Sequence, residues 1–299
     1  MMEQVQTGFL ILHYKNFEIT DRCISSILDL DEGETAKIIV VDNGSCNGSA
    51  KRLSDKYENN PMIDILVLEK GNGFSRGNNL GYEYIRKHYC LDFLVAANND
   101  ILFTQKDFIA LVKSEYRKYG FVILGMDMID TRSGAHLNPK YKAKSAQEIR
   151  EWIRQLELRK KRGNVRAVMT YLFQQSGWYQ KYVKHIRNRR PDVSRQRKLS
   201  SRYAADRVIQ GGCMVFSKLF LEKEEHLFWP ETQFYCEEDI LFERSRKHGW
   251  KILYSPKLYV LHEQGASFRA DRKSIQEKLI EGINYNLASA KILLKELEG

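Results

Sequence analysis

The sequence predicts an α/β protein with a mostly parallel central sheet flanked by helices. Two observations carry this prediction. Short apolar runs alternate with helical patterns over residues 7–128, and each run is apolar throughout rather than at every second position. Alternating strands and helices are typical of parallel strands with crossover helices. Strands that are apolar on both sides belong to a sheet that is covered on both faces.

The expected elements of this first half follow one another at short intervals. The strands are runs rich in Val, Ile, Leu and Phe, at Gly8–His13, Lys37–Val41, Ile63–Leu68, Asp92–Ala97 and Phe121–Met126. The helical patterns between them cover residues 17–30, 48–58, 76–90 and 105–118. We therefore expect residues 1–130 to form one α/β half of the protein.

The second half is expected in three parts, over residues 131–205, 206–270 and 271–299. The first is a basic, aromatic helical insertion. The second holds a strand over Val208–Phe216, a charged helix over Glu237–His248 and a short strand over Lys251–Tyr254 that ends in a Tyr254-Ser255-Pro256 turn.

A long amphipathic helix is expected over residues 271–298 in the last part. Its apolar residues repeat with 4-3-4-3 spacing at Ile283, Leu287, Ala290, Leu294 and Leu297. Such a stripe packs on its own domain or on a second copy of the chain, and a homodimer is the alternative that this leaves open.

The charge of the chain is concentrated in one segment. Of the net +10, residues 140–202 hold 19 Lys or Arg against 4 Asp or Glu, a balance of +15, which leaves −5 for the rest. A basic segment on an acidic body indicates an anionic partner, such as a membrane surface, a nucleic acid or a phosphorylated substrate.

Composition also limits where the protein is expected to work. Five dispersed cysteines without a Cys-x-x-Cys pair are typical of reduced intracellular thiols. No signal peptide is recognisable, and no apolar run approaches the ~18–20 residues that span a bilayer. We therefore expect a cytoplasmic protein.

Three loops follow expected strand ends in the first 100 residues. Asp42 and Asn43 come after the second strand, residues 71–81 form a glycine-rich loop after the third, and Asn98-Asn99-Asp100 ends the fourth. In an open α/β sheet the ligand binds outside the carboxyl ends of the strands, so these loops predict one composite site.

Each loop has a chemistry of its own. Asp42 can accept hydrogen bonds from a nucleobase or ribose, although turn and cap chemistry alone also explains its loop. The glycine-rich loop allows close backbone approach, and Arg76 adds a donor for phosphate or sugar oxygens. Asp100 can hold Mg²⁺ or Mn²⁺ together with substrate phosphates.

Two further groups lie in the second half. Glu237-Glu238-Asp239 begins a helix, where acidic residues favour the helix dipole and where one could also act as a general base. His262 follows the Val260-Leu261 run and is either structural or a metal ligand.

Taken in order, these motifs resemble those of the family 2 glycosyltransferases of GT-A fold, particularly the bacterial rhamnosyltransferase-like branch. The resemblance covers residues 7–128 and 205–267. It rests on Ile11-Leu12-His13-Tyr14, residues 40–45, residues 72–79, Asn98-Asn99-Asp100, Gly211-Gly212-Cys213-Met214, Glu237-Glu238-Asp239 and His262.

The resemblance implies inverting transfer of a sugar from a UDP- or dTDP-linked donor to a glycan or lipid-linked acceptor, with a divalent cation, in bacterial capsule or O-antigen synthesis. Donor-binding residues would be His13, Tyr14, Asp42, Asn43, Gly73, Phe74, Arg76, Asn79, Asn98 and Asn99. Acceptor-binding residues would be Gly211, Gly212, Cys213, Trp229 and Glu237, and the metal ligands Asp100 and His262.

The sequence departs from the family pattern at two places. The metal motif is often Asp-x-Asp, whereas Asn98 replaces the first carboxylate here. The base is ambiguous, because counting back from Arg244 places it at Glu238 while residue type places it at Asp239.

Residues 140–202 lie outside the family pattern. Their aromatic residues, Trp152, Tyr171, Phe173, Trp178, Tyr179 and Tyr182, stand among Lys and Arg. A basic, aromatic helical segment suits peripheral attachment to the anionic inner face of a membrane, and a solvated helical insertion is the alternative.

Two other classes of protein compete with this interpretation. A sugar-phosphate nucleotidyltransferase would need a glycine-rich basic signature after the first strand, where His13-Tyr14-Lys15-Asn16 stands instead. A nucleic-acid-binding protein would use the basic segment but would leave the acidic site unexplained, so no nucleic acid is expected.

Overall fold

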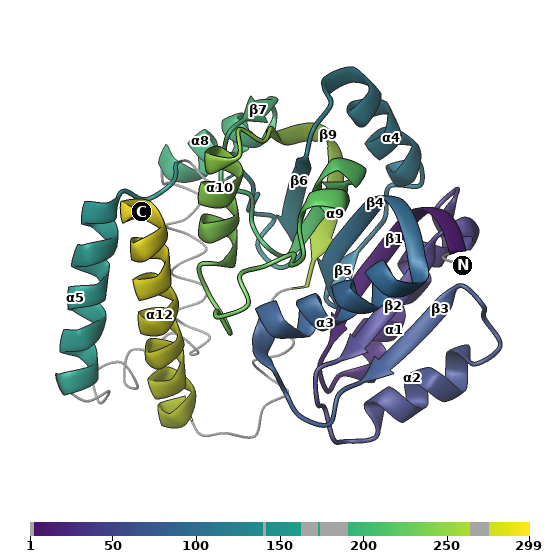
Figure 1. Ribbon diagram of the computed structural model, residues 1–299, viewed down its shortest axis with the longest axis horizontal. Helices are drawn as coiled ribbons and strands as arrows, with labels where there is room; N and C mark the ends of the chain where they lie inside the picture. The colour runs from purple at the N-terminus through teal and green to yellow at the C-terminus, as the bar shows by residue number, and fades with distance from the viewer. Residues whose placement is uncertain (1–2, 140–141, 163–172, 174–190, 264–274) are drawn as a thin grey trace.

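The computed structural model describes residues 3–139, 142–162, 173, 191–263 and 275–299. Within them a central sheet runs in the order β3-β2-β1-β4-β8-β6-β9-β5, with β7 paired to β9 (Figure 1). Helices cover both faces, as expected from strands that are apolar throughout. The α/β class predicted from the sequence is therefore confirmed.

The first half has the predicted parallel arrangement. Strands β1 (Glu3–His13), β2 (Lys37–Asp42), β3 (Ile63–Val67) and β4 (Tyr89–Asn98) pair in parallel, and β2 is buried along its whole length. The helices between them are α1 (Phe17–Leu28), α2 (Ser49–Tyr57) and α3 (Gly73–His88), with a short 3₁₀ turn η1 (Gly33–Thr35) after α1.

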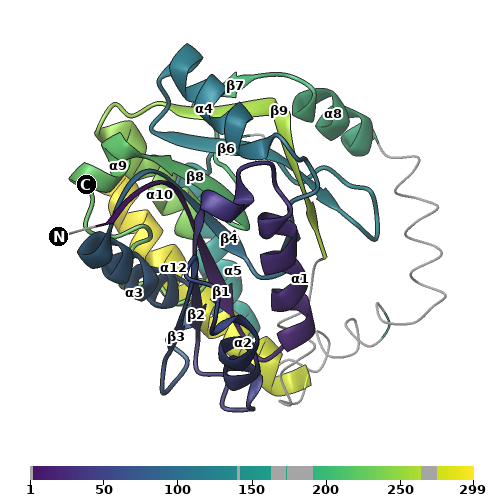
Figure 2. The same cartoon turned by 90° about the vertical axis from the view of Figure 1, so that its right-hand side faces the viewer.

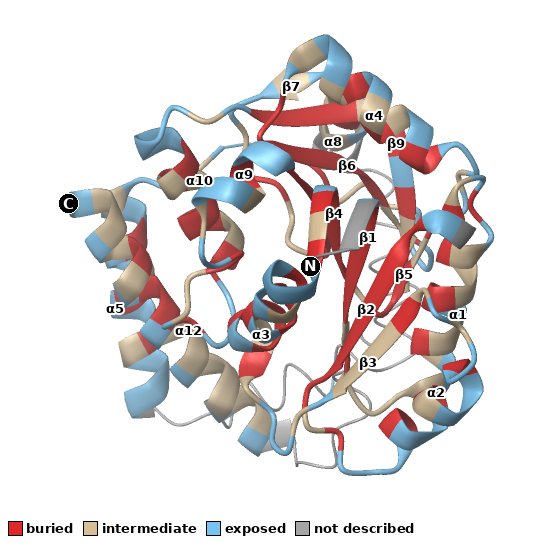
Figure 3. Cartoon of the chain, turned by 45° about the vertical axis from the view of Figure 1, so that its right-hand side comes forward, coloured by how far each residue is buried: buried red, intermediate tan, exposed pale blue. Residues whose placement is uncertain are grey.

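Two apolar clusters hold these layers together. On one face α1, α2 and α4 (Phe108–Tyr119) pack on the sheet through residues such as Ile24, Leu53 and Val112. On the other face α3, α9 (Lys218–Lys223) and α10 (Glu237–Lys247) contribute Tyr82, Phe220 and Leu241. Figure 2 shows α1 and α3 on opposite sides of the sheet, and Figure 3 shows the central strands β2, β4 and β6 mostly buried.

The second half adds antiparallel pairing to the sheet. Strand β6 (Ile123–Asp130) does not lie beside β4, because β8 (Cys213–Ser217) is inserted between them and is antiparallel to both. The strand expected over Val208–Phe216 is shorter than predicted and begins at Cys213. Two short strands, β5 (Ile101–Leu102) and β7 (Ala204–Ala205), have no signal in the sequence and pair antiparallel with β9.

The expected turn at Tyr254-Ser255-Pro256 is wrong. Strand β9 (Ile252–His262) continues through it, parallel to β6. The pairing passes from Met126 with Ser255 to Asp127 with Tyr259, so the residues between Ser255 and Tyr259 fall in an irregularity of the ladder. Proline lacks an amide hydrogen, and a bulge is where a strand tolerates it.

A helical layer at one end of the sheet carries part of the insertion and the end of the chain. Helix α12 (Ile275–Glu298) lies beside α5 (Ala146–Arg162), as Figures 1 and 2 show. Its expected stripe packs on the same chain, where Ala290 and Leu287 join a cluster with Ile149 of α5 and Ile240 of α10. The stripe is therefore used within the chain.

The basic segment is described in part only. Helix α5 and helix α8 (Pro191–Ser200) confirm its helical character where it is described. Tyr171, Trp178, Tyr179 and Tyr182 lie outside the described residues. None of the helices in the described ranges has the length and apolar character needed to cross a bilayer.

Candidate active site

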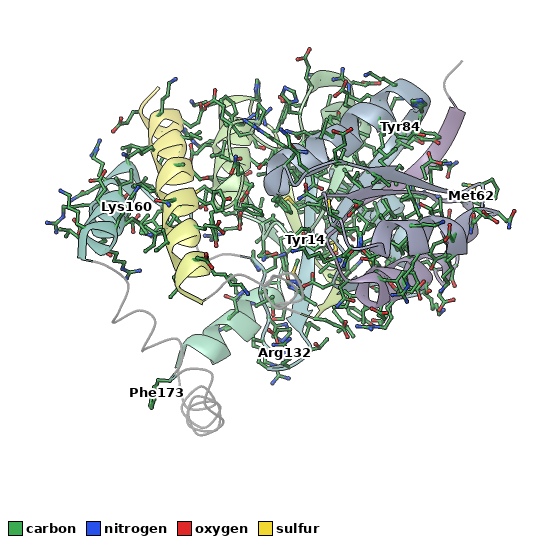
Figure 4. All side chains as sticks on the ribbon, turned by 90° about the horizontal axis from the view of Figure 1, so that it is seen from below. Tyr14, Met62, Tyr84, Arg132, Lys160 and Phe173 are labelled. Carbon is green, nitrogen blue, oxygen red and sulfur yellow. The ribbon has the colours of Figure 1, made fainter. Side chains whose placement is uncertain are left out.

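The carboxyl ends of the first parallel strands bring the predicted loops together. In the sheet register His13 is paired with Asp42, and Leu12 with Asn98. Tyr14 follows directly after β1 and lies near the middle of the molecule, between Met62 and Lys160 in Figure 4. The loops from which the sequence predicted a composite site thus lie along a single edge of the sheet.

His13 is fully buried below this edge. Its Nδ1 lies 2.7 Å from Thr20 Oγ1, and its Nε2 lies 2.8 Å from Ser49 Oγ. Burial lowers the pKa of His13 to about 4, although Asp42, 3.9 Å from Nε2, acts in the opposite direction. The imidazole is therefore neutral at pH 7 and joins α1 to the start of α2.

Thr20 extends this network to the third loop. Its hydroxyl accepts a hydrogen bond from the Asn99 side-chain amide at 2.8 Å. Asn99 is buried, while Asn98 is half-buried and its backbone amide donates to the carbonyl of Gly212 at 2.9 Å. The loop that carries Asp100 is thus tied both to His13 and to the opposite half of the molecule.

Asp42 is held in the turn that follows β2. It is buried, and it accepts hydrogen bonds from the Ser45 hydroxyl and, at 3.2 Å, from the Ser45 amide. Ser45 Oγ in turn accepts the backbone amide of Lys15 at 2.7 Å. This turn chemistry, which the sequence left as an alternative to ligand binding, fixes the direction of the carboxylate.

Asn43 connects the Asp42 turn to the glycine-rich loop. Its side-chain amide donates to the Gly73 carbonyl at 3.1 Å, and its side-chain oxygen accepts the Asn72 amide at 2.8 Å. Gly73 has φ +77°, and a Cβ there would lie 2.6 Å from the Gln233 carbonyl oxygen. Glycine is required at this position because of both its conformation and the close approach of the other chain segment.

The start of α3 is bound to a segment from the second half, residues 228–233. The Asn79 side chain makes two hydrogen bonds to the backbone of Phe228: it donates to the carbonyl at 2.8 Å and accepts one from the amide at 3.1 Å. The segment is held further by the Phe74 amide to Gln233, the Ser75 hydroxyl to Thr232 and Arg76 Nε to the Pro230 carbonyl. The loop that was expected to bind the donor therefore also connects the first half of the chain to the second, through residues 228–233.

Asp100 and His262 form the other end of the site. Pairing of Ile101 with His262 sets the two side chains next to each other, and Asp100 Oδ1 lies 3.1 Å from His262 Nε2. Both residues are buried. Asp100 Oδ1 and His262 Nδ1 are nevertheless among the buried polar atoms of the described residues that make no hydrogen bond.

This pair fits a divalent cation. Two ligands at right angles on an ion with bonds of about 2.1 Å stand about 3.0 Å apart, close to the observed separation. Buried polar atoms are normally satisfied, so an orphaned carboxylate oxygen indicates a missing partner. Within the described ranges no group of three or more His, Cys, Asp or Glu could hold a metal by itself. The remaining ligands would come from a substrate.

The acidic helix α10 faces the Gly211-Gly212 turn. A Cβ on Gly211 would lie 3.8 Å from Glu238 Oε2, which places this carboxylate beside the turn. Asp239 is buried, with Oδ2 3.5 Å from Lys144 Nζ, and Glu237 is also buried. Tyr235 and Cys236, just before the helix, both adopt positive φ, of 70° and 64°. Strain of this kind in non-glycine residues gathers at functional sites.

The remaining expected acceptor residues have different surroundings. Cys213 is buried in the core with its sulfur 3.5 Å from that of Met126. Trp229 packs beside the α5–α12 cluster, with the Arg244 guanidinium 5.7 Å from its ring centroid. Gly212 is turned toward Gln210, whose side chain accepts the Gly212 amide at 2.6 Å.

Sequence reasoning missed several residues of this region. Thr20 and Ser49 are ordinary helix residues without a recognisable pattern, and Lys144 is one of many lysines in its segment. The contact of Gln233 with Gly73 joins residues 160 positions apart. Of residues 228–233, only Trp229 was an expected acceptor residue, and the sequence alone gives this segment no partner.

Comparisons with known proteins agree with this geometry. Residues 9–136 match the model of a family described as Glycosyl transferase family 2. The whole chain has the fold of GT-A glycosyltransferases, which the structural neighbours share. Residues 9–136 thus carry a family 2 glycosyltransferase domain, and this favours a glycosyltransferase over the nucleotidyltransferase and nucleic-acid-binding alternatives.

The solved structures are distant relatives. S. aureus TarS 1-349 in complex with UDP-GlcNAc has 11% identity and a TM-score of 0.55, covering 98% of this chain and 72% of its own. The mannosyltransferase PcManGT from Pyrobaculum calidifontis, in complex with GDP-Man and Mn²⁺, has 11% identity and a TM-score of 0.53, covering 99% and 74%. No curated protein matches the chain.

Proposed function

We propose that the protein transfers a sugar, with inversion, from a nucleotide-diphospho-sugar to a hydroxyl of a glycan or lipid-linked acceptor in bacterial surface polysaccharide synthesis. The observation that carries this proposal is the buried Asp100–His262 pair, which has polar atoms without hydrogen bonds and lies at the same sheet edge as the Asp42 turn. Relatives that bind UDP-GlcNAc, or GDP-Man with Mn²⁺, support it.

The donor is expected to lie along the edge that joins these two features. Asp42 would accept hydrogen bonds from the nucleobase or ribose, with Tyr14 beside it at the end of β1. His13 is fully buried, so its proposed role is to position the Asp42 turn rather than to touch the donor. The start of α3, with exposed Arg76, would face the donor from the other side.

Asp100 and His262 would hold the divalent cation. A cation at this place supplies charge stabilisation for a nucleoside diphosphate leaving group. The buried position of the two side chains limits water, which strengthens such electrostatic interactions. Asn98 contributes a neutral amide where many relatives would have a second carboxylate, so the diphosphate itself would supply most of the remaining ligands.

Asp239 is the proposed general base, with Glu238 as the alternative. The acceptor hydroxyl would lose its proton to this carboxylate as its oxygen bonds to the anomeric carbon. The bond from that carbon to the diphosphate oxygen breaks at the same time, and the nucleoside diphosphate leaves with the electron pair. The position of Glu238 beside Gly211, an expected acceptor residue, supports a base on this helix, and Asp239 follows it directly with Oδ2 3.5 Å from Lys144 Nζ.

A thermal-shift panel tests the donor assignment. UDP-, dTDP- and GDP-linked sugars would be added with Mn²⁺ or with a chelator, and we expect at least one to raise the Tm only when Mn²⁺ is present. Stabilisation by none of the nucleotide-sugars would contradict the proposed donor site.

A pair of substitutions tests the base. A positioned general base contributes roughly 10²- to 10⁴-fold to a rate, so Asp239→Asn is expected to lose this factor in turnover while keeping donor binding. Glu238→Gln is the matched control because it removes a neighbouring carboxylate. Loss in Glu238→Gln alone would move the base to that residue.

We further propose peripheral attachment to the inner face of the membrane through residues 140–202. The +15 balance of this segment supports it, since each nearby Lys or Arg contributes about 1 kcal/mol at an anionic surface. Binding to vesicles containing anionic lipid should fall when Arg159, Lys160 and Lys161 are reversed to Glu. Unchanged binding would leave the solvated-insertion alternative.

A further inference from the structure

An exposed aromatic pair stands at the entrance to the acidic helix. Phe234 and Tyr235 are 38% and 47% exposed, although they immediately precede the buried Cys236 and Glu237. The residue before them, Gln233, bonds the Phe74 amide of the donor loop. The pair therefore occupies the short stretch of chain between the proposed donor site and the proposed base.

Both side chains are held in place by α12. The Ser289 hydroxyl donates to the Phe234 carbonyl at 2.7 Å, and the Phe234 and Tyr285 ring centroids are 5.1 Å apart. The Tyr235 hydroxyl packs against Gly282, where a Cβ would lie 3.7 Å away. Burial of this hydroxyl, with Glu237 nearby, raises the pKa of Tyr235.

Tyr235 combines this anchoring with an unusual backbone conformation. Its backbone, at φ 70°, turns against the preference of L-residues, which costs on the order of 1–3 kcal/mol. A turn that served only to enter the helix could use glycine at lower cost. The strained tyrosine is therefore a feature that folding alone does not require.

We propose that Phe234, Tyr235 and Tyr285 form an aromatic platform that binds a sugar ring of the acceptor next to the reactive hydroxyl. The proposal rests on the proposed function. Aromatic faces carry negative charge density and attract the polarised C–H groups on one face of a pyranose, while the edge of the sugar keeps its hydroxyls for polar partners.

The surroundings of the platform favour a sugar over a purely apolar occupant. Two of its three members are tyrosines, and Asn286 lies beside the Tyr235 hydroxyl. Glu237 follows directly in the chain and can accept hydrogen bonds from sugar hydroxyls. Ile280, 42% exposed on α12, is the one large aliphatic side chain of the described part of α12 that is prominently exposed. The two most exposed members of the platform, Phe234 and Tyr235, are both aromatic.

Binding of simple glycosides tests the platform. Saturation-transfer difference NMR would be recorded with methyl glycosides of glucose, galactose, N-acetylglucosamine and rhamnose, each with the protein, UDP and Mn²⁺. We expect transfer to the ring C–H protons of at least one glycoside. Tyr235→Ala and Phe234→Ala should each weaken this binding at least fivefold.

Two matched variants serve as controls. Tyr259→Ala removes a tyrosine that is 37% exposed on β9, and Leu219→Ala removes an apolar side chain that is 38% exposed on α9. Both should bind the glycoside as the unchanged protein does. A thermal scan of each variant would show that it is folded.

The outcomes separate this inference from the proposed function. If a nucleotide-sugar raises the Tm but no glycoside binds, or Tyr235→Ala binds it fully, the platform is wrong while the donor site stands. Binding of a short-chain polyprenyl phosphate at this surface in place of every glycoside would also overturn the proposal. Failure of all nucleotide-sugars to bind would overturn the function itself.

Discussion

The two ends of the proposed donor site differ in how their polar groups are satisfied. At the His13 end, the imidazole and the side chains of Asp42 and Asn43 bond to other groups of the protein. At the Asp100 end, two buried side chains lie 3.1 Å apart with orphaned atoms. The polar groups of the first end are satisfied within the protein, whereas the second end has buried polar atoms that make no hydrogen bond and is the proposed cation site.

The largest expected effect comes from removing the carboxylate at the Asp100 end of the proposed donor site. Asp100→Asn removes the negative charge without changing size, and we expect turnover to fall by a factor on the order of 10³ because a metal supplies several kcal/mol of charge stabilisation. Stability without metal should change little, because Asp100 Oδ1 makes no hydrogen bond and its close contact is the one with His262 Nε2 at 3.1 Å. Steady-state kinetics and thermal unfolding measure the two effects.

Asp130→Asn is the control for this change. Asp130 is also buried and pairs with His262 in the sheet register, but its Oδ1 accepts the amides of Arg132 and Ser133. An asparagine oxygen can accept the same bonds, so turnover should stay within a few-fold. An equal loss in both variants would show that acidic charge in general, rather than a metal ligand, is what matters.

A substitution at the His13 end should instead lower the stability of the protein more than its turnover. His13→Ala leaves Thr20 and Ser49 without their shared partner and opens a cavity, which we expect to cost about 3 kcal/mol of unfolding free energy. Urea unfolding measures this loss. The KM for the donor should rise more than kcat falls, because the Asp42 turn loses its support. Unchanged stability would remove His13 from its proposed positioning role.

The sequence could predict that both ends of the proposed donor site lie at one edge of the sheet. It could not predict that their polar groups are satisfied differently. Apolar runs ending in Asp42 and Asp100 were sufficient to place both at one edge, because parallel strands share their carboxyl ends. Nothing local to His13 indicates that Thr20 and Ser49 would satisfy it. The same limit explains why β8 was not expected between β4 and β6, since strand pairing depends on contacts between distant segments.

The pH dependence of stability sharpens the comparison through His13. Its folded pKa of about 4 lies below the ordinary 6.5, so only the unfolded chain takes up a proton between these values. Stability from this group is therefore complete above pH 6.5 and is lost as the pH falls toward 4. The expected loss from pH 7.5 to pH 5 is about 2 kcal/mol. Urea unfolding at both pH values should show this loss and show less of it in His13→Gln.

The smallest expected effect concerns Arg76, which belongs to neither end. Its Nε donates to the Pro230 carbonyl at 3.1 Å, yet the side chain is exposed at the start of α3. Arg76→Ala should cost less than about 1 kcal/mol of stability, because an exposed hydrogen bond contributes little net free energy. If the guanidinium also contacts the donor, the KM should rise about three- to tenfold, while Arg86→Ala, an exposed arginine near the other end of α3, should leave it unchanged. An unchanged KM in Arg76→Ala would instead limit this residue to holding residues 228–233 against the start of α3, through its hydrogen bond to the Pro230 carbonyl.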